Sequence, residues 1–263
     1  MPQFLIEPSA VKDNVATITG KDARHISQVL RLKKGDWLML TDGQGNRWKA
    51  VILSISPKEV VAVAQDFSPA NIGRPEGLRY KSTNITLAQA VIKHDRLEWI
   101  IQKAVELGCS RIVPFTSERT IPKFAGTPHK PARWQKIALE AAKQCGTTLR
   151  PTVEEPVPFL NLLTRLKPSE TNILFYEGET SANLSSLAPP DGGVQHADAG
   201  TVVMIGPEGG FSSDEVKKAK EAGVVTCGLG PLILRVETAS IAALTLVQQR
   251  LGYFERPPMG GII

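Results

Sequence analysis

The chain has 263 residues, of which 42% are hydrophobic, a length and composition that fit one large globular domain or two smaller ones. No apolar run is long enough to span a membrane, and the first residues lack the basic start and long apolar stretch of a signal peptide. We therefore expect a cytoplasmic protein. The three cysteines, Cys109, Cys145 and Cys227, form no Cys-x-x-Cys pair and support neither a zinc site nor a disulfide framework.

The net charge of +5 is concentrated in the middle of the chain. Residues 74–150 carry 14 basic and 6 acidic side chains, whereas residues 1–73 carry 9 and 7 and residues 151–263 carry 8 and 13. Such a basic block suits a polyanion such as RNA, because Lys and Arg that neutralise phosphates release counterions. A solvated basic face without a partner is the plainer alternative.

The first seventy residues are predicted to form mainly strands. Residues 36–43, 46–56 and 59–67 are rich in β-branched and aromatic side chains, and turn dipeptides separate them. This pattern indicates a small β-barrel over residues 1–73, interrupted by one short helix at 23–30. Residues 68–77 combine glycine and proline without periodicity, which predicts an interdomain linker.

After the linker, short apolar runs alternate with amphipathic segments. Strands are predicted at 84–91, 111–117, 172–178, 201–206 and 224–230, and helices at 95–107, 131–145, 213–222 and 237–251. This alternation is typical of a parallel α/β sheet, which assigns residues 74–263 to a second domain.

Two glycine-rich turns join predicted strands to predicted helices. The first, "IGPEGG" at 205–210, precedes Ser212-x-x-Glu215, which fits a capping box. The second, "LGPLIL" at 229–234, leads into the last helix, whose start is flanked by Arg235 and Glu237. Ligands of open α/β sheets bind at this edge, and glycines allow close approach, so two such turns indicate one pocket. The structural alternatives are plain tight turns, with Glu237 a first-turn helix acid and Arg235 its surface partner.

Several familiar ligand and catalytic motifs are absent from the sequence. No phosphate loop of the form G-x-x-x-x-G-K-[ST] occurs, and "CGLGPLI" has Ile233 where a dinucleotide fingerprint needs its third glycine. The chain contains neither H-E-x-x-H nor G-x-S-x-G, and its four histidines are scattered. The sequence therefore gives no support for a catalytic metal or a serine nucleophile.

Five ordered motifs carry a resemblance to a known family: "HISQVLR", "DRLEWIIQKAVELG", "EAAKQCG", "IGPEGGFS" and "LGPLILRVETA". From about residue 4 to residue 251 the chain closely resembles the ribosomal RNA small-subunit methyltransferase E family of SPOUT methyltransferases. The resemblance implies a PUA-like β-barrel followed by an α/β domain with a parallel sheet and a trefoil knot. It also implies transfer of a methyl group from S-adenosyl-L-methionine to N3 of a uridine near the 3′ end of 16S ribosomal RNA, by a homodimer that acts on the RNA or on the 30S subunit.

The resemblance further implies which residues form the site. The cofactor-binding residues, from three loops, are Tyr176, Glu177, Ile205, Gly206, Pro207, Gly209, Gly210, Leu229, Gly230, Ile233 and Leu234. For the chemistry, we expect Arg235 to stabilise negative charge on the uracil oxygens, and Glu237, or alternatively Glu208, to accept the N3 proton or orient the base. The expected RNA contacts are Arg24, Arg31, Arg96, Lys103, Arg119, Lys123, Lys143 and Arg150.

Three positions depart from the family pattern. Gln3, Thr147 and Leu232 stand where many members have arginine, which removes expected RNA contacts but leaves the cofactor turns intact. Two other functions stay open at this point: a SPOUT methyltransferase that modifies another position, such as a ribose 2′-hydroxyl, and a non-catalytic RNA-binding protein.

Overall fold

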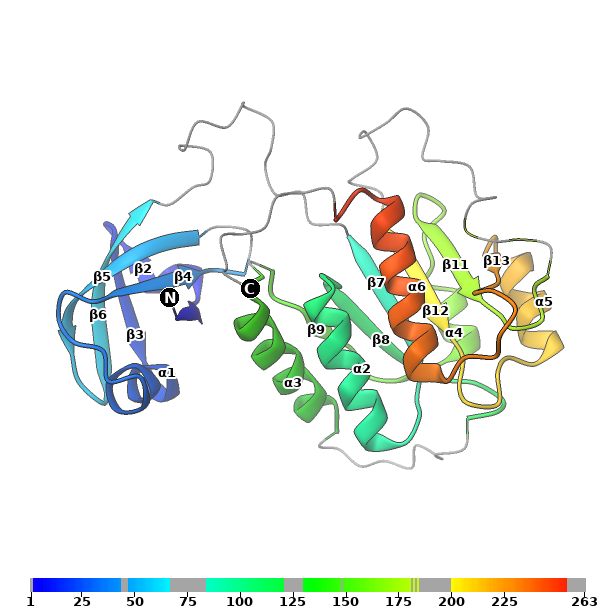
Figure 1. Ribbon diagram of the computed structural model, residues 1–263, viewed down its shortest axis with the longest axis horizontal. Helices are drawn as coiled ribbons and strands as arrows, with labels where there is room; N and C mark the ends of the chain where they lie inside the picture. The colour runs from blue at the N-terminus through cyan, green and yellow to red at the C-terminus, as the bar shows by residue number, and fades with distance from the viewer. Residues whose placement is uncertain are drawn as a thin grey trace. The chain divides into compact units, whose positions relative to one another are not determined.

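The computed structural model describes residues 2–43, 47–66, 84–120, 130–147, 149–180, 182, 184 and 200–254. Its contacts divide the chain into two compact units, Met1–Lys81 with Ala142–Arg150, and Ser82–Ala141 with Pro151–Ile263. The linker expected at 68–77 lies outside the described residues, so the domain boundary at 73/74 stays a prediction. Figure 1 shows the elements of both units.

The first unit contains a six-stranded sheet that curls around an apolar core (Figure 1). Its strands are β1 (Gln3–Leu5), β2 (Val11–Lys12), β3 (Val15–Thr19), β4 (Trp37–Thr41), β5 (Arg47–Ile55) and β6 (Glu59–Asp66). Their order is β1-β4-β5-β6-β3-β2, in which β1 runs parallel to β4 and the other pairs are antiparallel. On β3 alternate residues, Ala16 and Ile18, are buried, as expected for a strand that packs one face on a core. The three strands predicted from residue 36 onward are confirmed.

The predicted helix at 23–30 is confirmed, but it begins earlier and changes its hydrogen-bonding pattern. The α-helix α1 (Gly20–Arg24) continues into the π-helix η2 (His25–Val29), and a 3₁₀ turn, η1 (Pro8–Ala10), precedes both. Arg31 then adopts φ 53°, a left-handed conformation that is uncommon for a residue with a side chain. Ile26 is fully buried, whereas Arg24 and Arg31 are exposed.

The second unit is built on a seven-stranded sheet in which every strand pair is parallel. Its strands are β7 (Ile85–Ala90), β8 (Arg111–Thr116), β9 (Thr152–Val153), β10 (Val157–Pro158), β11 (Thr171–Phe175), β12 (Thr201–Ile205) and β13 (Val225–Cys227). The order is β10-β8-β7-β12-β11-β13, with β9 beside β8. All five strands predicted here are confirmed. The sequence did not predict β9 and β10, because two residues are too few to show a period.

Five helices of the described chain lie wholly or mainly in this unit: α2 (His94–Glu106), α3 (Lys130–Cys145), α4 (Phe159–Leu163), α5 (Ser213–Glu221) and α6 (Val236–Arg250). The residues of α3 from Ala142 onward belong to the first unit. The four predicted helices are confirmed, and α4, only five residues long, is the addition. Figure 1 shows α2 and α6 side by side in front of the sheet, and α6 packs on α2 and β12. Hydrogen bonds to other segments fix α6: Ser240 Oγ donates to Gln89 Oε1 of β7 (2.7 Å), Gln248 Nε2 to the Leu107 carbonyl (2.6 Å) and Arg250 Nη1 to the Leu184 carbonyl (3.0 Å).

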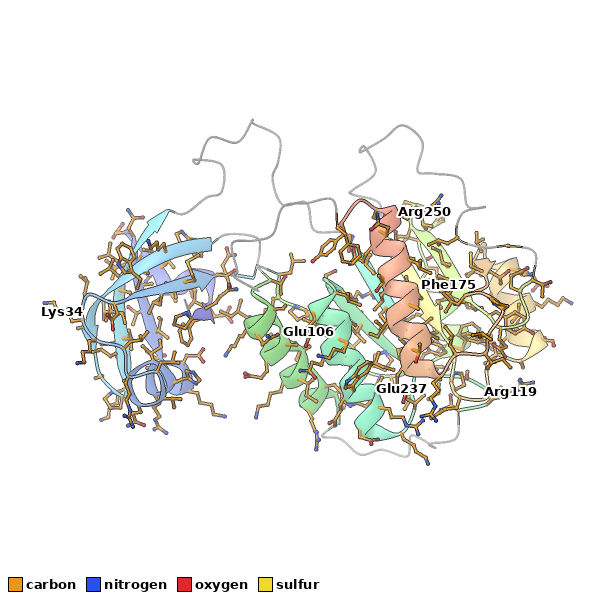
Figure 2. The ribbon with its side chains drawn as sticks, viewed as in Figure 1. Lys34, Glu106, Arg119, Phe175, Glu237 and Arg250 are labelled. Atoms are coloured by element: carbon orange, nitrogen blue, oxygen red, sulfur yellow. The ribbon has the colours of Figure 1, made fainter. Side chains whose placement is uncertain are left out.

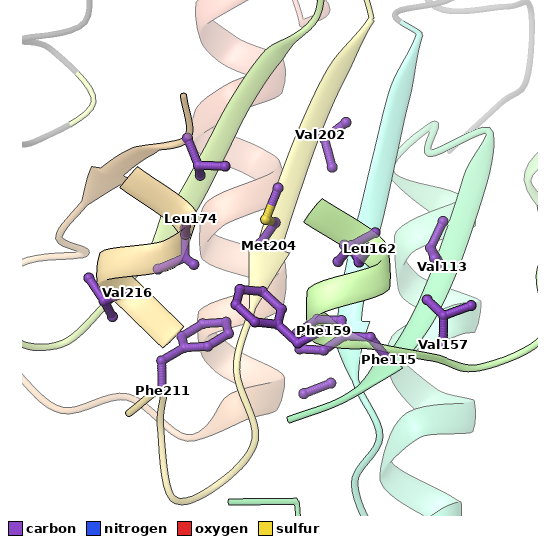
Figure 3. Packing of buried hydrophobic residues seen from close by; sticks show 14 residues of the cluster. Val113, Phe115, Val157, Phe159, Leu162, Leu174, Val202, Met204, Phe211 and Val216 are labelled. Atoms are coloured by element: carbon purple, nitrogen blue, oxygen red, sulfur yellow. The ribbon is translucent and has the colours of Figure 1, made fainter. Parts of the chain in front are cut away.

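The opposite face of the sheet carries an aromatic core (Figure 3). Phe115 at the end of β8, Phe159 of α4 and Phe211 pack together, with ring centroids 5.2 to 6.0 Å apart. Phe211 directly follows the glycine turn at 205–210 and is 2% exposed. The core therefore anchors one end of that turn.

Candidate active site

A cavity of about 690 Å³ lies at the carboxyl ends of three neighbouring strands, β12, β11 and β13. Its walls come from the loops that follow these strands, from the start of α6 and from Arg96 of α2. Figure 2 shows Phe175, which ends β11, and Glu237, in the first turn of α6. The carboxyl edge of a parallel sheet is where open α/β folds bind ligands.

The structure brings the predicted cofactor residues together. All eleven line this cavity: Tyr176, Glu177, Ile205, Gly206, Pro207, Gly209, Gly210, Leu229, Gly230, Ile233 and Leu234. Arg235, Glu237 and Glu208 line it too. Phe175, Pro231 and Leu232, which lie within the three predicted loops, line it as well. Four lining residues lie outside those loops and were not predicted: Phe211, Gly228, Val236 and Ala239. Phe211 and Gly228 adjoin the glycine motifs directly, and that adjacency is the signal that could have found them.

The loop after β12 is a tight turn whose backbone faces a side chain of the neighbouring loop. Gly210 has φ 67°, and its N–H donates to the Pro207 carbonyl at 2.9 Å. A Cβ atom at Gly210 would collide with the carboxylate of Glu177. The left-handed backbone favours glycine here, and a side chain at this position would displace the Glu177 carboxylate from the turn.

The loop after β8 contacts the glycine turn from outside the pocket, a connection that the sequence did not predict. The predicted capping box is confirmed, because Glu215 N–H donates to Ser212 Oγ and Ser212 N–H donates to Glu215 Oε2. The other carboxylate oxygen of Glu215 accepts a hydrogen bond from the N–H of Glu118 at 2.9 Å. Next to it, Arg119 Nη1 donates to the Gly209 carbonyl at 2.9 Å. The loop after β8 thus fixes two points around the glycine turn.

The loop after β13 is fixed by Glu179, another residue that the sequence did not indicate. Thr226 Oγ1 donates to Glu179 Oε2 at 2.6 Å, and Lys220 Nζ lies 3.5 Å from the same oxygen. A Cβ atom on Gly228 would lie 2.6 Å from the Glu179 carbonyl oxygen, so the two chain segments touch through their backbones. Further along, Leu232 and Ile233 are 75% and 90% exposed, so their side chains project outward at the pocket.

The charged groups of the pocket pair differently from the simple expectation for a helix start. Arg235 is the N-cap of α6, and its guanidinium is exposed and has no ionic partner within the described part of the chain. Glu237 pairs instead with Arg96, whose Nε lies 3.3 Å from Glu237 Oε1. Arg96 Nη1 also lies 3.7 Å from Glu208 Oε1. The interpretation of Arg235 as the surface partner of Glu237 is therefore wrong.

The two carboxylate oxygens of Glu237 have different surroundings. Oε1 faces Arg96, whereas Oε2 is buried and has no hydrogen-bond partner among the residues that the structure describes. A buried acceptor without a donor is uncommon in folded proteins and is often found where a ligand or solvent group completes the site.

The predicted RNA-contacting residues are spread over both units. In the first unit, Arg24 and Arg31 are exposed, Lys143 pairs with Asp22 (3.1 Å) and Arg150 pairs with Glu7 (2.7 Å). In the second unit, Lys103 pairs with Glu106 (2.8 Å), while Arg96 and Arg119 make the contacts given above. Lys123 lies outside the described residues. The role of all eight in RNA binding stays a prediction.

Two of the departures from the family pattern contact each other. Gln3 Nε2 donates to the backbone carbonyl of Thr147 at 3.1 Å. The third, Leu232, adds an exposed apolar side chain to the pocket.

In the described ranges, no three His, Cys, Asp or Glu side chains gather in an arrangement that would hold a metal ion. No described helix has the length and apolar character needed to cross a membrane.

Comparisons with known proteins agree with this architecture. Residues 79–248 match the family described as RNA methyltransferase domain, and residues 18–65 match the RNA methyltransferase PUA domain. The fold and site thus define an RNA methyltransferase with a SPOUT α/β trefoil-knot domain preceded by a PUA-like β-barrel, as the family resemblance implied.

Relatives that match most of the chain give the family. The ribosomal RNA small subunit methyltransferase E of Bacillus subtilis is 33% identical over 238 residues, 88% of each chain. That of Buchnera aphidicola subsp. Acyrthosiphon pisum is 27% identical over 257 residues, 97% of this chain and 96% of the relative. A crystal structure of a ribosomal RNA small subunit methyltransferase E from Neisseria gonorrhoeae, bound to S-adenosyl methionine, is 29% identical with a TM-score of 0.79 and covers 95% of this chain and 97% of its own. The chain belongs to the ribosomal RNA small subunit methyltransferase E family.

Proposed function

We propose that the protein methylates N3 of a uridine near the 3′ end of 16S ribosomal RNA, with S-adenosyl-L-methionine as methyl donor. The observation that carries this proposal is the meeting, in one pocket, of the three loops, two of them glycine-rich turns, with the guanidinium of Arg235, which has no ionic partner among the described residues. A relative with the same fold is described as bound to S-adenosyl methionine, which supports the choice of donor.

The pocket residues fit this cofactor. The cavity, about 690 Å³, is within the range of small-molecule sites. Its glycine turns present backbone N–H and C=O groups that suit the hydrogen-bonding edges of adenine, and Leu229 and Leu234 supply apolar contact. The carboxylate of Glu177, packed over Gly210, offers an acceptor for ribose hydroxyls. When bound, S-adenosyl-L-methionine supplies a methyl group activated by a sulfonium sulfur.

The side chains around the pocket suit the other half of the reaction. N3 of uridine carries a proton at neutral pH, so the new N–C bond forms only as that proton leaves. We assign Arg235 to the negative charge that then grows on the uracil oxygens. Glu237, or alternatively Glu208, accepts the N3 proton or orients the base. The remaining task is alignment, with N3 held about 3 to 3.5 Å from the methyl carbon.

The RNA partner is proposed to be 16S ribosomal RNA in the cytoplasm, as the naked molecule or within the 30S subunit. The PUA-like unit and its exposed Arg24 and Arg31 support an electrostatic contact with the phosphate backbone.

A homodimer is supported by the outer face of α6. Between Glu237 and Arg250 this helix has no charged residue, although several of its side chains face outward. Leu246 is 46% exposed, and Trp99 on the neighbouring α2 is 44% exposed. A surface helix normally shows a charged face, so we assign these apolar side chains to a contact with a second copy of the chain.

The test is methyl transfer from labelled S-adenosyl-L-methionine to 30S particles and to naked 16S RNA that lack the modification, followed by mass spectrometry of the nucleosides. We expect 3-methyluridine at one position near the 3′ end. A ribose-methylated nucleotide would show that the protein is a different SPOUT methyltransferase. Absence of both transfer and calorimetric binding of the cofactor would instead identify a non-catalytic RNA-binding protein.

A further inference from the structure

We propose that Arg96 is a positioning residue of the active site, which holds Glu237 and Glu208 at the mouth of the pocket, and that it does not contact RNA phosphate. This inference rests on the proposed function, because it assigns a purpose to the carboxylates used there. It replaces the role that the family resemblance suggested for Arg96.

The geometry places one guanidinium between carboxylates from two other elements. Arg96 extends from α2, Glu237 lies in the first turn of α6, and Glu208 lies in the glycine turn after β12. Arg96 Nε is 3.3 Å from Glu237, and Arg96 Nη1 is 3.7 Å from Glu208. Their side chains are 39%, 21% and 29% exposed, so all three are partly removed from water. One side chain therefore connects three separate parts of the pocket.

The charges explain why an arginine is needed at this position. Two carboxylates at one pocket mouth repel each other, and the guanidinium offsets this repulsion with N–H groups that point in different directions. Lysine carries its three donors on one nitrogen, whereas the guanidinium spreads its donors over three nitrogens and can contact each carboxylate through a different one. The trio has a net charge of −1, so Arg96 has no surplus charge with which to attract a phosphate.

The contacts of the two Glu237 oxygens show how Arg96 positions this carboxylate. Arg96 engages Oε1, whereas Oε2 is buried without a hydrogen-bond donor in the described structure. The carboxylate is thus anchored through one oxygen, and the hydrogen-bonding capacity of the other is unused. The uracil N3–H of the proposed substrate is a donor of the kind that this oxygen lacks.

The experiment is a double-mutant cycle with Arg96→Gln, Glu237→Gln and the double variant, measured on the 30S substrate. We expect Arg96→Gln to lower kcat about a hundredfold, the effect typical of a misplaced reacting group, while KM for the 30S particle stays within about twofold. In the Glu237→Gln background, the same change should cause a much smaller loss, because only the contact with Glu208 remains to be broken. Arg96→Lys should restore part of the lost kcat, because it keeps one of the two ion pairs. The matched control is Arg133→Gln. Arg133 pairs with Glu98, which lies on α2 as Arg96 does, and neither residue of this pair lines the pocket.

Two results would overturn the inference. One is an increase in the KM of Arg96→Gln with kcat unchanged, together with a weaker dependence of RNA binding on salt. The slope of log K against log salt concentration would then fall in magnitude by about one, as for the loss of one phosphate contact. The other is an equal loss of kcat with and without Glu237. Thermal unfolding of the unmodified protein, the two single glutamine variants and the double variant gives a second cycle that does not depend on activity. Additive changes in Tm would contradict the ion pair between Arg96 and Glu237. Failure of the proposed function appears separately, as absence of 3-methyluridine with the unmodified protein.

Discussion

The carboxylate of Glu215 accepts a hydrogen bond from the backbone N–H of Glu118 at 2.9 Å, across 97 residues of sequence. The same carboxylate caps α5 through the N–H of Ser212. One side chain, 7% exposed, therefore connects the loop after β8 with the glycine turn of the pocket.

Replacing Glu215 should affect stability and cofactor binding together. In Glu215→Gln, one of the two acceptor oxygens becomes an NH₂ group, so one buried N–H loses its partner at a cost of about 1 to 3 kcal/mol. We expect this loss in urea unfolding, with weaker cofactor binding in calorimetry. Glu221→Gln, at the exposed end of the same helix, is the control and should change neither quantity. Unaltered unfolding of Glu215→Gln would contradict the bridging role.

Gly210 and Gly223 form a matched pair for testing the turn. Both have positive φ, 67° and 80°, so alanine at either position should cost about 1 to 2 kcal/mol of backbone strain. Only at Gly210 would the new Cβ meet Glu177, whereas at Gly223 it meets nothing within 4 Å. We expect Gly223→Ala to lower Tm alone, and Gly210→Ala to lower Tm and weaken cofactor binding more than about tenfold, or 1.4 kcal/mol. Equal cofactor affinities in the two variants would disprove the proposed role of the turn.

Arg235 tests the proposed chemistry. Its guanidinium has no ionic partner in the described structure, so Arg235→Ala removes no ion pair and should fold normally. We expect kcat to fall about 10²- to 10³-fold, as for other groups that stabilise developing charge, with cofactor affinity largely retained. Single-turnover methylation and calorimetry measure the two effects. Normal turnover in this variant would exclude the assignment.

The three thiols should differ in reactivity and in pH dependence. Burial raises the pKa of Cys109 to about 11, and burial followed by the nearby Glu179 raises the pKa of Cys227, whereas Cys145 is exposed. At pH 8 we expect a disulfide reagent to label Cys145 quickly and the other two only after unfolding. Because the pKa of Cys109 in the folded protein exceeds the 9.0 of a solvent-exposed thiol, the stabilisation linked to its protonated thiol is complete below pH 9 and is lost as the pH rises towards about 11. Rapid labelling of all three cysteines in the folded protein would contradict the burial.

The dimer proposal is tested by a charge on α6. Leu246→Glu should yield a monomer in sedimentation velocity, because it buries a carboxylate in the proposed apolar contact. Leu160→Glu is the control: Leu160 is 48% exposed on α4, which packs on the other face of the sheet. If both variants sediment like the unaltered protein, α6 does not form the subunit contact.

Much of the architecture was predictable because the second unit alternates apolar strands with capped helices. The capping box at Ser212 and the last helix from residue 237 were recognisable from local patterns alone. The elements that were not predicted, β9, β10 and α4, are two to five residues long and are held by their neighbours rather than by their own periodicity.

The pocket-lining residues were predictable from the glycine turns, but their partners were not. Nothing in the local sequence indicates that Glu179 receives a hydrogen bond from Thr226, or that Arg96 lies beside Glu237. These contacts depend on strand order, which brings distant segments to the same edge of the sheet. From the sequence alone, Arg96 is indistinguishable from an unpaired arginine that could bind RNA, because its partner Glu237 is distant in the sequence.

The order of the parallel sheet also has a consequence for how the protein is made. Its central strand β12 pairs on one side with β7, where Thr201 lies opposite Ile85, and on the other side with β11. During synthesis, β7, β8 and β11 leave the ribosome well before the strand that joins them. The edges of β7 and β11 that pair with β12 therefore stay unpaired until β12 has been synthesised. Long-range parallel pairing of this kind is slow. A chain released early, before residue 201, would expose two apolar strand edges to aggregation.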